Sequence, residues 1–127
     1  MSAAPGQLST GAQQTSAEVR RWAAQRISAL VLALCVAVHL LVMMFAVRGG
    51  LSGAEILART QGHWGFALFY GIFVLAVAVH VPLGLANIAR EWAGLSSSAA
   101  WRLAQVLGWL LLLGGARAVW AVYTGGA

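Results

Sequence analysis

Residues 64–88, WGFALFYGIFVLAVAVHVPLGLANI, decide the fold of this chain. The stretch has no Asp, Glu, Lys or Arg, and Trp64 and Trp92 mark its two ends. As a helix it would be roughly 37 Å long, enough to cross a hydrocarbon layer of about 30 Å. It therefore predicts a transmembrane helix that ends near Ile88 and carries one histidine, His80.

Two further apolar runs flank this stretch. Only 9% of the 127 residues are charged and 61% are hydrophobic, whereas soluble domains are about 25% charged. We therefore expect an all-α integral membrane protein, a bundle of three transmembrane helices. The predicted spans cover residues 27–47, 64–89 and 101–123.

The remaining segments are short and polar. Residues 1–17 are rich in Ser, Ala, Gln and Gly, and we expect a disordered tail. Residues 18–26 hold Trp22 and three arginines, which predicts a short amphipathic segment at the interface before the domain at 27–123. Between the first two spans, residues 52–59 predict a short interfacial turn that Ser52 caps.

The arginines predict the orientation. Five of them, at positions 20, 21, 26, 90 and 102, lie on the N-terminal side, and three lie on the other side, at positions 48, 59 and 117. Positive loops stay inside, so we expect the N-terminus to be cytoplasmic. We expect the membrane itself to be the bacterial cytoplasmic membrane. The same rule accounts for the net charge of +5, and no aromatic-basic segment indicates nucleic-acid binding.

His39 and His80 lie inside predicted spans, where an ionisable residue indicates function. A neutral imidazole within a helical bundle is a good axial ligand for haem iron, so both are candidate metal ligands. Ala76 and Gly84 lie one turn either side of His80 and would admit a flat macrocycle. The alternative is close helix packing around a hydrogen-bonded histidine.

The depths of the two histidines leave the number of haems open. His39 lies thirteen residues after Arg26, or roughly 20 Å, and His80 lies ten residues before Arg90, or roughly 15 Å. One haem bridged by both histidines and two haems at different depths both remain possible.

Several of these residues form motifs. His80-x-x-x-Gly84 is followed by Asn87 and an Arg90-Glu91-Trp92 exit, and Gln25-Arg26-Ile27-Ser28 opens the first span. This combination resembles the cytochrome b membrane-anchor subunits of succinate dehydrogenase and fumarate reductase, respiratory complex II. The resemblance implies that His80 binds haem b, and that His39 serves a second haem farther from the dehydrogenase. It also implies that Arg26 and Ser28 contact quinone or a haem propionate.

The resemblance further implies a function and partners. The chain would pass electrons from flavoprotein and iron–sulfur subunits to ubiquinone or menaquinone, with a second anchor subunit or second copy completing the haem ligation in the lipid membrane. We expect no catalytic residue or dicarboxylate site here, because only three carboxylates and no dinucleotide-binding fingerprint are present. The alternatives are a cytochrome b subunit of another membrane dehydrogenase or hydrogenase, and a haem-free structural anchor.

Overall fold

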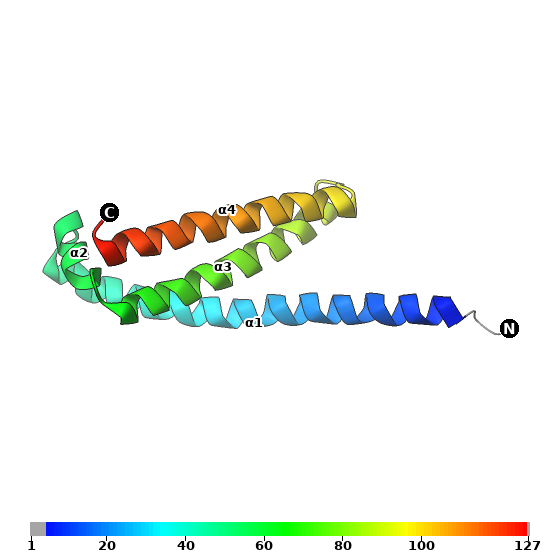
Figure 1. The fold of residues 1–127 in the computed structure, drawn as a ribbon, viewed down its shortest axis with the longest axis horizontal. Coiled ribbons are helices and arrows are strands. Elements are labelled where there is room, and N and C mark those ends of the chain that lie inside the picture. Colours follow the sequence, from blue (N-terminus) through cyan, green and yellow to red (C-terminus); the bar gives the residue numbers. More distant parts are fainter. Residues whose placement is uncertain (1–4, 127) are drawn as a thin grey trace.

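All the regular secondary structure in the part of the chain that the structure describes is helical (Figure 1). The structure is a computed structural model that describes residues 5–126, with the side chains of residues 11–126. It confirms the predicted all-α class, and three helices are long and apolar enough to cross a membrane. The helices are α1 (Pro5–Gly49), α2 (Gly53–Thr60), α3 (Trp64–Glu91) and α4 (Ser97–Thr124).

Helices α3 and α4 form an antiparallel hairpin, and α1 packs along α3 (Figure 1). The N-terminal part of α1 extends beyond the turn that joins α3 to α4. Short helix α2 lies at the opposite end of the bundle and contacts α4. The two ends of the chain lie at opposite ends of the molecule, as three successive crossings require.

Helix α1 is longer than we expected from the sequence. Residues 5–17, predicted as a disordered tail, and residues 18–26, predicted as a separate interfacial segment, continue without a break into the first span. Pro5 suits the first position of a helix, and no later proline interrupts a stretch rich in Ala and Gln. Residues 1–4 of the predicted tail lie outside the described residues.

The α3–α4 contact depends on two glycines of α4. A Cβ atom at Gly115 would lie 2.6 Å from Cγ1 of Val74, and one at Gly108 would lie 3.1 Å from Cγ of Pro82. The absence of a side chain therefore lets α4 approach α3 closely, as is common between transmembrane helices. Gly114 meets nothing within 4 Å and has no such role.

Ser52 caps α2, as the sequence predicts. Its hydroxyl accepts a hydrogen bond from the Glu55 amide at 3.3 Å, and the Glu55 carboxylate accepts one from the Ser52 amide at 2.8 Å. The Ser52 hydroxyl also donates to the Glu55 carboxylate at 2.6 Å, and this bond, together with the one from the Ser52 amide, holds the pKa of Glu55 below its ordinary value. The Thr60 hydroxyl lies 3.0 Å from the Val122 carbonyl oxygen, which fastens the end of α2 to α4.

Candidate functional site

His80 and Ser28 meet where α3 crosses α1. Nδ1 of His80 lies 3.3 Å from the Ser28 hydroxyl oxygen, although the two residues are 52 positions apart in the chain. Ser28 is buried, with 6% of its surface exposed, and its hydroxyl also donates to the Gln25 carbonyl at 3.1 Å. The structure thus brings together two residues that the sequence analysis proposed for different roles.

These two contacts bear on the tautomer of the imidazole. A serine hydroxyl has a single proton, and here that proton is given to the Gln25 carbonyl. Both contacts are hydrogen bonds at the same time only when Nδ1–H of His80 donates to the hydroxyl oxygen. In the neutral ring Nε2 then carries no proton and keeps a free electron pair. That tautomer is the one in which a histidine binds a metal through Nε2.

Gly84 packs against α1. The position of a Cβ atom at Gly84 would be 3.4 Å from Nε2 of Gln25, and Ala76 on the other side of His80 is buried. The glycine therefore accommodates α1, and the open flat face that we expected next to His80 is covered on that side. This arrangement corresponds to the helix-packing alternative, in which the imidazole is hydrogen-bonded within the protein, here to the Ser28 hydroxyl.

His39 has a separate environment at another depth. Its Nδ1 lies 3.1 Å from the Tyr70 hydroxyl oxygen, and its ring meets those of Tyr70 and Phe73 edge-on at 5.9 Å and 6.3 Å between centroids. His39 and Tyr70 both line a largely apolar cavity of about 490 Å³ that α2 helps to close. Because the tyrosine hydroxyl can either donate or accept here, both tautomers of His39 satisfy this contact.

The two histidines do not face one another. His39 lies beside Tyr70 of α3, to which it is hydrogen-bonded. His80 lies ten residues, or roughly 15 Å, further along α3 than Tyr70. Two axial ligands of one iron must approach it from opposite sides at bonding distance. The geometry therefore favours two separate sites over one haem held by both histidines of a single chain.

Arg26 lies apart from this site. Its guanidinium carbon is 5.4 Å from the centroid of the Trp22 ring, and the residue is exposed. Ser28, the other residue expected to contact quinone, points instead to His80. Arg26 and Ser28 thus have different surroundings, and Ser28 serves to orient the imidazole.

Sequence reasoning missed two residues of these sites, Tyr70 and Gln25. Tyr70 has one local signal, a hydroxyl inside a span of few polar side chains, but nothing in the sequence pairs it with His39. The side-chain oxygen of Gln25 is buried and has no hydrogen-bond partner among the described residues. Within residues 5–126, no group of three or more His, Cys, Asp and Glu side chains could hold a metal ion.

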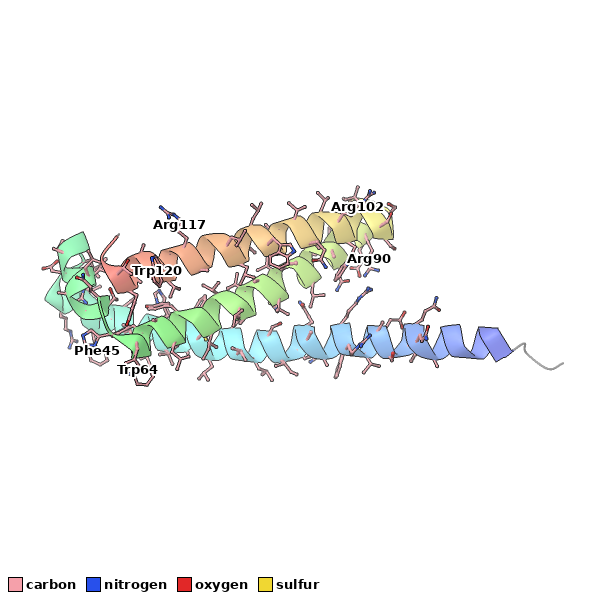
Figure 2. All side chains as sticks on the ribbon, in the orientation of Figure 1. Phe45, Trp64, Arg90, Arg102, Arg117 and Trp120 are labelled. Carbon is pink, nitrogen blue, oxygen red and sulfur yellow. The ribbon has the colours of Figure 1, made fainter. Side chains whose placement is uncertain are left out.

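A second, more polar cavity of about 610 Å³ lies between α1, α3 and α4. Arg21 lies over the Trp101 ring at 4.7 Å from its centroid, and Arg90 donates to the Asn87 side-chain oxygen. Figure 2 shows Arg90 near the α3–α4 turn and Arg117 well away from it along α4. This cavity therefore lies at the end of the bundle where the N-terminal part of α1 emerges.

Comparison with known proteins gives no relative, because no family model, curated protein or solved structure matches this chain.

Proposed function

We propose that this chain is a haem b-binding membrane-anchor subunit of a succinate:quinone oxidoreductase. The observation that supports it best is the Ser28–His80 hydrogen bond: when Nδ1–H of His80 is the donor, Nε2 of this intramembrane imidazole carries no proton. A transmembrane imidazole in that tautomer suits an axial ligand of haem iron. The resemblance of the His80-x-x-x-Gly84 and Gln25-Arg26-Ile27-Ser28 motifs to complex II anchors then supplies the class of complex.

In this proposal His80 holds one haem, and bound haem supplies a one-electron carrier within the membrane. Ser28 fixes the ring orientation and the tautomer of His80, and the apolar helices keep water away from the ligand. His39 holds a second haem beside its 490 Å³ cavity, with Tyr70 as the hydrogen-bond partner of its ring. Each site then has one ligand from this chain, and a second anchor subunit or copy supplies the other.

The remaining chemistry belongs to partner subunits. The chain has three carboxylates and a single cysteine, so flavin and iron–sulfur centres would lie in partners on the cytoplasmic side, where we place the N-terminus. Electrons from succinate would reach ubiquinone or menaquinone near this interface. With Ser28 bonded to His80, Arg26 is the residue of the predicted pair that remains free for quinone or a propionate.

A second candidate function, a haem-free structural anchor, is favoured by a different observation. Both intramembrane histidines already have a hydroxyl partner within the chain, and Gln25 covers Gly84. Hydrogen bonds of this kind hold transmembrane helices together without any cofactor. In that case the chain would tether its partners to the membrane and carry no electrons.

Absorption spectra separate the two functions. The intact complex, purified from membranes, should show the Soret and α bands of a low-spin b-type cytochrome and should oxidise succinate. His80→Ala should remove one low-spin haem signal, and His63→Ala, at an exposed position before α3, should leave the spectrum unchanged. A colourless complex, or a spectrum that His80→Ala does not alter, would overturn the haem proposal.

A further inference from the structure

The polar cavity at the α3–α4 turn has no part in the function proposed above, because neither His39 nor His80 lines it. We propose that this cavity binds the headgroup of an anionic phospholipid. The inference holds whether or not the chain binds haem, since it depends on residues at the membrane surface. Its walls come from α1, α3 and α4, so a bound lipid would join the end of α1 to the hairpin.

The charge of the cavity favours an anion. Arg21 and Arg90 line it together with one carboxylate, Glu18. Neither arginine forms a salt bridge with any carboxylate among the described side chains, and each is held by a neutral group instead: Arg21 by the Trp101 ring and Arg90 by Asn87. Two guanidinium groups without an ion-pair partner suit a phosphate, which guanidinium binds through paired hydrogen bonds.

The start of α4 adds to this attraction. Ser97 and Ser98 line the cavity and form the first turn of a 28-residue helix. Amides of a first turn have no acceptor within the helix, and the helix dipole favours negative charge there. The Ser96 hydroxyl accepts a hydrogen bond from the Ala99 amide. This side-chain cap therefore does not use the amides of Ser97 and Ser98.

The other walls are apolar, which favours a lipid over a free ion. Leu83, Ala86 and the rings of Trp22 and Trp101 line the cavity beside the charged groups. Tryptophans of this kind lie at headgroup depth, and the apolar stretch of α3 ends at Ile88, just before Arg90. The phosphate of a bound lipid would lie near the arginines, and its acyl chains would lie along the apolar wall of the cavity.

Native mass spectrometry of the full chain in detergent tests the proposal. Equal amounts of phosphatidylglycerol and phosphatidylcholine with identical acyl chains are added, and the ratio of the two bound forms is measured. We expect phosphatidylglycerol to dominate. Since a basic residue near the surface contributes about 1 kcal/mol, Arg21→Gln or Arg90→Gln should lower the ratio about fivefold and the double variant roughly 25-fold.

Matched variants make the test specific. Arg117→Gln removes an exposed arginine far from the cavity and should leave the ratio unchanged, whereas Glu18→Gln removes the one carboxylate and should raise it. Equal retention of the two lipids, or an equal fall in Arg117→Gln, would overturn the proposal. Displacement of phosphatidylglycerol by millimolar inorganic phosphate would overturn it as well, because the site would then bind free phosphate.

Discussion

Ser28 on α1 and His80 on α3 are joined by a hydrogen bond of 3.3 Å that crosses the interface between the two helices. Ser28 is one of the few buried polar residues of the chain, and its own proton goes to the Gln25 carbonyl. When the serine accepts from Nδ1–H of His80, Nε2 is the ring nitrogen that stays free. In a haem protein, such a partner controls how firmly the imidazole holds the iron.

If His80 holds haem as proposed, Ser28→Ala should weaken haem binding without removing the ligand. Loss of an outer-shell partner lowers metal affinity roughly 10-fold to 100-fold, because the ring loses its fixed tautomer and orientation. Titration of the haem-free complex with haem, followed in the Soret region, measures this change. Ser28→Thr keeps the hydroxyl and should retain most of the affinity; unchanged binding in Ser28→Ala would mean that the serine does not support the ligand.

Tyr70→Phe tests the other histidine. The Tyr70 hydroxyl and Nδ1 of His39 lie 3.1 Å apart, and such bonds between transmembrane helices contribute about 0.6 kcal/mol on average. A double-mutant cycle with Tyr70→Phe and His39→Ala, measured by unfolding in mixed micelles, should give a coupling energy of about that size. Additive effects would show that the contact contributes nothing to stability. Tyr70→Phe with His80→Ala serves as the uncoupled control.

The sequence predicted the spans well and the contacts between them less completely. Apolar runs of membrane length are a local signal, so each of the three expected spans lies within a long apolar helix of the structure, although α1 begins well before residue 27. In a membrane, however, residues that face lipid and residues that face another helix are equally apolar, and hydropathy does not fix how α1 is rotated about its axis. For that reason the sequence identified Ser28 and His80 as separate candidates and did not predict their contact, and it missed Tyr70 as the partner of His39.

Gly115→Ala should destabilise the α3–α4 hairpin. The new Cβ would lie 2.6 Å and 2.8 Å from the two methyl groups of Val74, whose β-branched side chain has little freedom to rotate away. Overpacking of this kind costs about 1–3 kcal/mol, measurable by unfolding in mixed micelles. Gly114→Ala is the matched control, since nothing lies within 4 Å of that position, and it should be neutral or stabilising. Equal effects of the two changes would contradict the close contact.

Acid should loosen α2 through Glu55. The hydrogen bonds from Ser52 lower the pKa of this carboxyl, so its stabilising effect is fully present above the pKa of the unfolded chain. That effect is lost as the pH falls through the lower pKa of the folded chain. An NMR titration of the Glu55 carboxyl should show a midpoint below the ordinary value for glutamate, and Ser52→Ala should move it upward. A midpoint that Ser52→Ala does not change would rule out the cap as its cause.

Gln25→Met should leave stability unchanged or raise it, which is unusual for a polar residue at a helix interface. The side-chain oxygen of Gln25 is buried without a partner in the described part of the chain, and an unsatisfied buried acceptor costs about 1–3 kcal/mol. Met has a similar length and could fill the same space against Gly84 without that cost. Gln105→Met, at an exposed position on α4, provides the comparison in the same unfolding assay. A clear loss of stability in Gln25→Met alone would mean that this oxygen does receive a hydrogen bond in the membrane, from water, lipid or a partner subunit.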